Sequence, residues 1–299
     1  MSFPIQQYGK NKIVSEKISL GGRILIYKCT ENQRGLILDF LAEDPITNLF
    51  VVADIEKYGF DSLDQDIWAY TNELEGIEGV LLRYKDIAIP VHGEEFSGFD
   101  TFLPLLQSLD EIKVISGGKI VVDQYIDYFP ELEVTETVIS VCRELLGQPQ
   151  SMTLVEELEK ADIPAYVIWQ NQCFEEPSES EMVLSEMLAS KDVIIKIIKN
   201  EHNQIISSGR VSAESSQAAM LTRIGTVKTE EGKGYATIIT AYLTQHCLEN
   251  DKKACLFYHN PTAGSIYHRL GYHDTTKNWS MLKAKKEETK KNIFQELIS

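Results

Sequence analysis

A glycine-rich turn at residues 231–237 constrains this chain more than any other segment. The turn reads Glu-Gly-Lys-Gly-Tyr-Ala-Thr and opens an amphipathic stretch that predicts a helix over Gly234–Glu249. Glycine has no Cβ, so a helix that begins with Gly-x-Gly exposes its first backbone N–H groups. Exposed amides at a helix N-terminus bind phosphate groups. The turn therefore predicts a site for a ligand that carries a pyrophosphate.

A second motif follows the turn at residues 260–272. The pattern predicts a short apolar strand over Ala254–His259 and a helix over Thr262–Leu270, with Asn260 between them. Tyr267 lies near the end of that helix, just before a Leu-Gly-Tyr run. A phenol at such a position can supply a proton if it meets the reacting atoms.

The composition is that of a folded protein large enough for two domains. The chain has 299 residues, of which 43% are hydrophobic. No window holds the roughly 18 uninterrupted apolar residues of a membrane span, and the first residues lack the pattern of a signal peptide. The five cysteines are scattered and form no C-x-x-C pair, which argues against a disulfide framework or a zinc ribbon. We therefore expect a cytoplasmic protein with no bound metal and no contact with a membrane.

The net charge of −16 is unevenly distributed along the chain. Residues 1–150 contain 12 Lys and Arg against 25 Asp and Glu, whereas residues 151–299 contain 17 against 20. An acidic chain is a poor partner for DNA or RNA, because phosphate neutralisation supplies most non-specific affinity. We therefore expect no nucleic-acid partner. The acidic half either serves solubility alone or attracts a cationic amine.

Hydrophobic periodicity and turn residues predict a similar order of elements in the two halves. In the first half they favour strands at Lys12–Lys28, Asp66–Asn72, Gly79–Arg83, Ile87–Val91, Lys113–Ser116 and Thr137–Arg143, and helices at Glu31–Ala42, Asp44–Tyr58, Phe99–Leu109 and Lys119–Tyr128. In the second half they favour strands at Met152–Leu154, Val193–Lys199, Gln204–Val211, Ala218–Val227, Ala254–His259 and Trp279–Lys283, and helices at Ile163–Cys173, Ser178–Ser190, Gly234–Glu249 and Thr262–Leu270.

The polar, turn-forming run Gly147–Ser151 separates these halves and predicts two domains, 1–150 and 151–299. The first half has Gly117 and Gly118 where the second has the Gly-Lys-Gly turn. Residues 283–291 form a charged run that we interpret as a solvated helix or tail.

Residues 160–285 resemble the GNAT superfamily of N-acyltransferases, in particular the branch related to the C-terminal domain of glycine N-acyltransferases. The resemblance lies in the runs 226–237 and 260–272, which are separated by one helix and one strand. It implies an α/β fold in which a mixed, mainly antiparallel sheet is flanked by helices. Because the first half has a similar element order, we interpret it as a degenerate copy, so that the chain would contain two tandem GNAT-like halves.

The resemblance also implies acetyl-CoA as a co-substrate. The pantetheine arm would pair with the backbone of residues 224–226 between two splayed strands, and the pyrophosphate would lie over the N–H groups of residues 232–237. The coenzyme-binding residues implied in this way are Ile224, Thr226, Glu231, Gly232, Lys233, Gly234, Tyr235, Ala236, Thr237 and Asn260. Glu231 departs from the family pattern, which has Arg or Gln three residues before the glycine found here at position 234.

By the same resemblance, Tyr267 is the candidate catalytic residue that protonates the leaving thiolate. The alternative is a packing role, because Tyr267 stands at helical spacing from Ala263 and Leu270. No general base stands out. Glu214 is a weak candidate, and the base is otherwise a bound water, or the amine arrives neutral.

The resemblance implies an acetyl-CoA-dependent N-acetyltransferase that acts on a small amine or an amino-acid-like acceptor. A non-catalytic acyl-CoA-binding regulatory protein is the alternative, favoured by Glu231 and by the missing base. A third hypothesis is an aminoacyl transferase that builds peptidoglycan bridges, which the acidic charge disfavours. A homodimer is compatible with each hypothesis.

Overall fold

The computed structural model describes residues 17–20, 23–72, 76–110, 112–147, 151–175, 178–191 and 193–284. It divides into two units that are not continuous in sequence. The first unit comprises Met1–Phe40, Phe60–Glu136 and Ser280–Ser299, and the second comprises Leu41–Gly59 and Thr137–Trp279. Strands β7 (Leu132–Cys142) and β13 (Tyr272–Ala284) contribute residues to both units.

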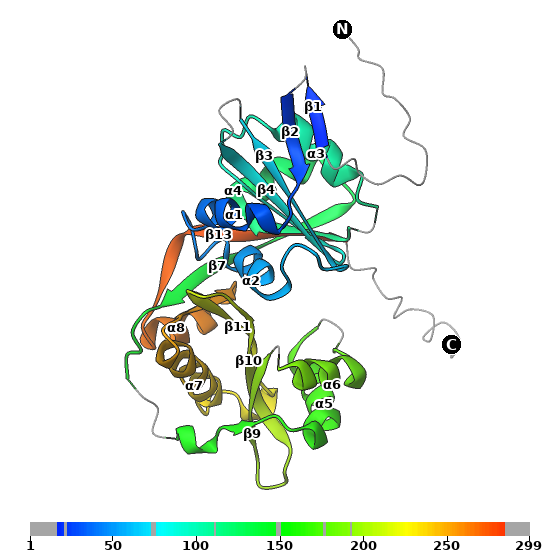
Figure 1. Ribbon diagram of the computed structural model, residues 1–299. Helices are drawn as coiled ribbons and strands as arrows, with labels where there is room; N and C mark the ends of the chain where they lie inside the picture. The colour runs from blue at the N-terminus through cyan, green and yellow to red at the C-terminus, as the bar shows by residue number, and fades with distance from the viewer. Residues whose placement is uncertain are drawn as a thin grey trace, which may run out of the picture. The chain divides into compact units, whose positions relative to one another are not determined.

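The first unit holds a sheet with the strand order β1-β2-β3-β4-β5-β6. Its strands are β1 (Lys17–Leu20), β2 (Arg23–Lys28), β3 (Gln65–Thr71), β4 (Ile77–Tyr84), β5 (Ile87–His92) and β6 (Val114–Gly118). Neighbours pair antiparallel, except β5 and β6, which are parallel. The helices of this unit are α1 (Arg34–Leu41), α3 (Phe99–Gln107) and α4 (Lys119–Val122), as Figure 1 shows.

Aromatic side chains fill the core of the first unit. Trp68, Tyr70, Phe102 and Tyr125 are buried together with the apolar side chains of α3 and α4. The buried His92 ends β5, stacks on Phe96 with the ring centroids 4.4 Å apart, and bonds the Tyr125 hydroxyl over 2.9 Å. These side chains fill the space at the end of β5, beyond its last pair with β6.

The second unit holds a sheet with the order β7-β12-β11-β10-β9-β8. Its further strands are β8 (Glu156–Glu157), β9 (Ile194–Lys199), β10 (Ile205–Glu214), β11 (Ala218–Thr226) and β12 (Lys253–Tyr258). Strands β11 and β12 are parallel, and the other neighbours are antiparallel. Isoleucine and valine favour these strands because a β-branched side chain packs well on a pleated, half-buried surface.

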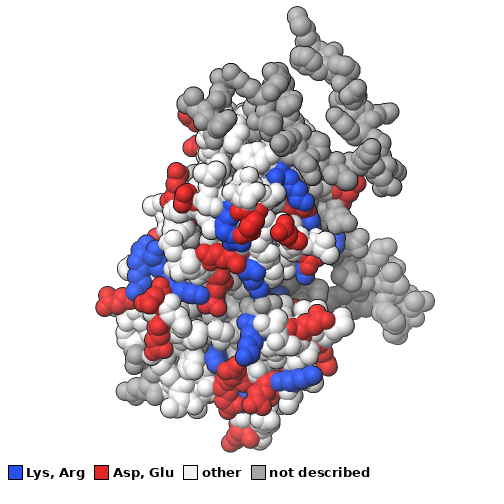
Figure 2. All heavy atoms as spheres, in the orientation of Figure 1, with Lys and Arg blue, Asp and Glu red and all other residues white. Residues whose placement is uncertain are grey.

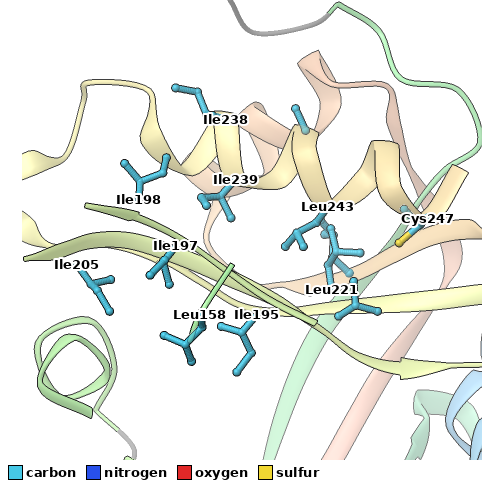
Figure 3. Packing of buried hydrophobic residues seen from close by; sticks show 14 of the residues in the cluster. Leu158, Ile195, Ile197, Ile198, Ile205, Leu221, Ile238, Ile239, Leu243 and Cys247 are labelled. Carbon is cyan, nitrogen blue, oxygen red and sulfur yellow. The ribbon is translucent and has the colours of Figure 1, made fainter. Parts of the chain in front are cut away.

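Among the described residues, five α-helices accompany the second sheet. They are α2 (Leu49–Tyr58), α5 (Ile163–Cys173), α6 (Glu181–Ser190), α7 (Tyr235–Glu249) and α8 (Pro261–Arg269). Helix α7 packs against β9 to β12, and Figure 3 shows Ile239, Leu243 and Cys247 pointing from it toward the strands. Helix α5 packs against β10, and α2 packs against β10 and β11.

The mixed α/β fold and its mainly antiparallel sheet with flanking helices confirm the predicted fold class. In each unit a parallel strand pair is joined through a helix: β5, α3 and β6 in one, and β11, α7 and β12 in the other. The loop before α3, residues 93–98, therefore corresponds in topology to the glycine turn. The expectation that Gly117 and Gly118 do so was wrong, because they end β6. That the first half is a degenerate copy stays a prediction.

Most predicted elements are present, with shifted ends. Residues 152–154 form a short 3-10 helix rather than a strand, because Leu154 N and Val155 N bond back to Ser151 O and Met152 O. Helix α2 begins only at Leu49, and the predicted helix at 119–128 turns into a 3-10 helix after Val122. The closing strand β13 is longer than predicted. The core of the predicted linker, residues 148–150, and the charged run beyond residue 284 lie outside the described residues.

The two units also differ from the predicted division at residue 150. Residues 41–59 belong with the second unit because α2 packs on β10 and β11. Glu56 strengthens this attachment, since its carboxylate accepts hydrogen bonds from the backbone N and the hydroxyl of Ser216, both over 2.7 Å. Residues 41–59 are far in sequence from the strands on which they pack, so no local change in composition marks this attachment.

Candidate functional site

The parallel ladder between β11 and β12 stops before either strand ends. Its last pair is Leu221 with Leu256, whereas β11 continues to Thr226 and β12 to Tyr258. The exposure changes at the same point, because residues 218–221 are buried and residues 222–226 are half-buried. Backbone groups of residues 222–226 on this side are therefore available to an extended ligand. Ile224 and Thr226, two of the predicted coenzyme-binding residues, lie in this segment.

A β-bulge shapes β11 in this segment. Ser208 pairs with Gly225 and Arg210 with Thr222, so β11 contains an extra residue, and Arg223 adopts a φ of 52°. Bulges redirect side chains and end strand pairing. The Ile224 side chain lies against Gly209, because a Cβ added to Gly209 would be 3.2 Å from Ile224 Cγ1. The bulge thus lies directly after the last paired residue of β11.

The glycine turn follows β11 and leads into α7. Gly232 has a φ of 78° and Gly234 a φ of 88°, the left-handed region that favours glycine. A Cβ at either position would meet no atom within 4 Å, so the space beside both is open. Gly234 is the N-cap of α7, and no side chain caps the helix there. The first amides of α7, from Tyr235, Ala236 and Thr237, have no acceptor within the helix.

Two charged residues flank these amides. The ammonium group of Lys233 lies 2.8 Å from the Glu230 carboxylate, and this hydrogen bond raises the pKa of Lys233. Glu231 is exposed. Burial raises the pKa of the Cys173 thiol to about 11, and the nearby charge of Glu231 adds to this effect. The uncapped amides and the helix dipole give the turn the chemistry of an anion site.

Tyr267 and Asn260 lie on α8. Tyr267 is 7% exposed, and its ring contacts those of Tyr258 and Tyr272 at centroid distances of 5.7 and 5.9 Å. Burial raises the pKa of Tyr267 to about 12, and no described residue bonds its hydroxyl. Asn260 is the N-cap of α8, where its Oδ1 accepts a hydrogen bond from Thr262 N over 2.9 Å. The Asn260 side chain thus has a structural role at the start of α8.

The structure also assembles polar clusters that local sequence patterns did not reveal. Glu179 lies 3.0 Å from Arg210 and 3.8 Å from Arg223, beside the bulge. Asp274 accepts a hydrogen bond from the Tyr258 hydroxyl over 2.7 Å and lies 3.0 Å from His268. Except for His268 and Asp274, the partners in these clusters are at least 16 residues apart, so local sequence patterns do not predict the contacts.

Glu214, the weak candidate for a general base, binds a neighbouring lysine. It ends β10 and forms an ion pair with Lys252 over 3.0 Å.

Residues 195–281 match the family model described as GNAT acetyltransferase. The match covers the bulged strand, the glycine turn and both motif helices. Over these residues the chain is similar to the GNAT acetyltransferase family. No curated protein matches the sequence.

Solved structures share the fold over most of the chain at low sequence identity. A Drosophila protein has a TM-score of 0.63 at 8% identity and covers 87% of this chain and 98% of its own. A GCN5-related N-acetyltransferase from Sphaerobacter thermophilus has a TM-score of 0.56 at 10% identity, covering 88% and 96%. A GCN5-related N-acetyltransferase-like protein from Streptococcus suis has a TM-score of 0.55 at 12% identity, covering 86% and 100%. At such identities the likeness shows the fold alone.

Proposed function

We propose that this protein is an acetyl-CoA-dependent N-acetyltransferase that acts on a small amine or an amino-acid-like acceptor. The observation that carries the proposal is the combination of an interrupted β11–β12 ladder with an open, uncapped glycine turn directly after it. A thioester carrier needs both features: an extended edge for its amide-containing arm and backbone N–H groups for its diphosphate. The residues present fit this ligand.

The arm would bond the backbone between Ile224 and Thr226, and the diphosphate would lie over residues 232–237. Lys233 supplies a cation beside that group even while it bonds Glu230. The exposed Glu231 carboxylate can point into solvent, so backbone amides would carry most of the binding. Asn260 would contribute through the backbone turn that it caps.

In the reaction, a neutral amine attacks the thioester carbon and the thiolate leaves. Tyr267 is our candidate for the group that protonates this thiolate. Its raised pKa keeps the phenol protonated across the physiological range, which suits a proton donor. Its place on α8, next to the Tyr258 ring of β12, is near the open end of the ladder.

The test is release of free thiol from acetyl-CoA in the presence of a panel of small amines and amino acids. Amine-dependent release supports the proposal. Tight coenzyme binding without turnover on any amine would instead support a non-catalytic acyl-CoA-binding regulator.

We also propose that the protein works in a reducing compartment such as the cytoplasm. Its five cysteines are free thiols, and four of them are buried. No helix in the described part of the chain is long and apolar enough to cross a bilayer.

A further inference from the structure

Tyr258 lies on β12 beside the open end of the β11–β12 ladder. It follows Leu256, the last residue of β12 that pairs with β11, by two positions, so both side chains lie on the same face of the strand. The backbone of Tyr258 pairs with Val138 of β7. Because β12 lies between β7 and β11, the other edge of β12 at this position faces the unpaired end of β11.

The ring of Tyr258 contacts helix α8 at two positions. Gly264 and Tyr267 are three residues apart, so both lie on the face of α8 that meets this ring. The rings of Tyr258 and Tyr267 are edge to face, with their centroids 5.7 Å apart. A Cβ at Gly264 would lie 2.5 Å from Tyr258 Cε2. The ring therefore occupies space that any larger residue at position 264 would take.

Asp274 of β13 holds the hydroxyl group of Tyr258. This hydroxyl donates to Asp274 Oδ2 over 2.7 Å, and His268 Nε2 lies 3.0 Å from Asp274 Oδ1. Although burial acts in the opposite direction, the hydrogen bonds from His268 and Tyr258 lower the pKa of Asp274. The carboxylate is therefore ionised at neutral pH, and hydrogen bonds to an ionised acceptor are roughly twice as strong as neutral ones.

The two phenols of this contact differ in their hydrogen bonds. The Tyr258 hydroxyl bonds Asp274, whereas no described residue bonds the buried hydroxyl of Tyr267. Loss of the Tyr258 proton would place a phenolate beside a carboxylate, and like charges disfavour that state. Tyr267 is therefore the better proton donor of the two, and Tyr258 is suited to holding it in place.

Tyr267 also contacts the ring of Tyr272, but packing alone holds that ring. Tyr272 is 1% exposed, and its ring centroid lies 5.9 Å from that of Tyr267. Tyr258 is only half-buried, and its hydrogen bond to Asp274 is exposed to solvent. The position of Tyr258 therefore depends on this bond, whereas Tyr272 stays in place without its hydroxyl group.

We propose that Tyr258, held by Asp274, is a positioning residue that orients the Tyr267 ring for protonation of the leaving thiolate, an inference that rests on the proposed N-acetyltransferase function. Tyr258 exchanges no proton with the substrates. The amine nitrogen bonds the thioester carbon, the C–S bond breaks, and the thiolate takes the Tyr267 hydroxyl proton. The phenolate regains a proton through water, which carries the one that the amine nitrogen loses. The sum is amine plus thioester giving amide plus thiol.

The experiment is a double-mutant cycle of Tyr258→Phe and Tyr267→Phe, in which kcat and KM are measured with acetyl-CoA and an amine that the panel identifies. A misplacement of about 1 Å costs up to about 100-fold in rate, so Tyr258→Phe alone should lower kcat by about 10-fold. Its KM for acetyl-CoA should change less than about twofold. In the Tyr267→Phe background it should lower kcat by less than about twofold further, because the hydroxyl that it positions is already absent.

Three further variants test the same contact. Gly264→Ala should lower kcat by about 10-fold although alanine favours a helix, because the added Cβ displaces the Tyr258 ring. Asp274→Ala should lower kcat as Tyr258→Phe does, and Asp274→Asn should lose less, because its amide oxygen still accepts the hydroxyl proton. The matched control is Tyr272→Phe, which should keep kcat within about twofold. Thermal melting shows which variants are folded at the assay temperature.

The outcomes separate this inference from the proposed function. If wild-type protein is active and Tyr258→Phe is equally active, or if the two Tyr→Phe losses multiply in full, the positioning role of Tyr258 alone is wrong. An equal loss of kcat in Tyr272→Phe would also contradict it. Wild-type protein with no turnover on any amine overturns the proposed function, and this inference with it.

Discussion

At the scale of single residues, Tyr267 is a buried phenol whose hydroxyl no described residue engages. Tyr272 offers a matched contrast, since it is also buried but bonds the Thr244 hydroxyl over 2.6 Å. We expect Tyr267→Phe to lower kcat by about 100-fold, because a proton donor of this kind contributes at least that much. Coenzyme affinity by calorimetry should stay nearly unchanged.

The control for this variant is Tyr272→Phe. It removes a buried hydrogen bond worth about 1 kcal/mol of folding stability and should leave kcat unaffected. If Tyr267→Phe instead weakens turnover and coenzyme binding equally, Tyr267 has a structural role.

Gly234 provides a second prediction at this scale. Its φ of 88° costs a residue with a Cβ about 1–2 kcal/mol, and a larger side chain would fill the open space beside the amides. Gly234→Val should therefore weaken coenzyme binding by tenfold or more in calorimetry. Gly35→Ala, at an exposed helical position with free space around it, should bind as wild type does. Normal binding by Gly234→Val would refute the phosphate turn.

His92 predicts how stability depends on pH. Its Nδ1 donates to Gly93 O over 2.8 Å and its Nε2 accepts from the Tyr125 hydroxyl, which requires the neutral ring. Burial lowers the pKa of His92 below 6.5, against the effect of the Gly93 carbonyl. The unfolded chain then binds the proton more readily, so stability is full above pH 6.5 and falls as the pH decreases.

Urea titrations at pH 7.5 and 5.5 measure this effect. His92→Phe should show a smaller loss of stability between the two pH values than wild type, whereas the exposed His202→Gln should show the same loss. An unchanged loss in His92→Phe would contradict the assignment.

At the scale of elements, local signals and long-range contacts were predictable to different degrees. The glycine turn and the helix after it follow from the sequence, because a positive φ and a helix start are local properties. The end of the ladder at Leu221 and Leu256 depends on the register between strands about 35 residues apart, which no single segment encodes. The position of α2 could not be predicted either, because it packs on β10 and β11, which lie far along the chain from it.

The place of α2 leads to a prediction about truncation. A fragment of residues 151–299 lacks α2 and β7, so Phe257 and the edge of β12 lose their partners. We expect this fragment to melt well below the full chain or to aggregate, as differential scanning fluorimetry and light scattering would show. A stable fragment that binds acetyl-CoA would support the predicted domain boundary at residue 150 instead.

At the scale of the whole molecule, the two parallel strand pairs differ in what fills the loop after the first strand. A Cβ at Gly98, before α3, would lie 2.5 Å from Phe96 and 2.6 Å from Tyr70, whereas the positions of Gly232 and Gly234 are open. Side chains therefore fill the space beside the N-cap of α3, whereas the corresponding space at α7 is open. We expect one coenzyme per chain, measured as the calorimetric stoichiometry, and a value of two would contradict this account.

The surface distribution of charged residues gives little further information about ligand binding. On the face that Figure 2 shows, Asp and Glu stand beside Lys and Arg rather than in a patch of one sign. That face therefore offers no patch of one sign for an anionic ligand, and in our proposal the coenzyme is bound by local backbone amides.

The central claim is that the amides at the start of α7 and the unpaired end of β11 bind acetyl-CoA. Isothermal titration of acetyl-CoA into the full chain tests it most directly, with Gly234→Val as the comparison. The account predicts saturable heat at one equivalent for wild type and at least tenfold weaker binding for the variant. Folded wild-type protein that gives no heat of binding would contradict it.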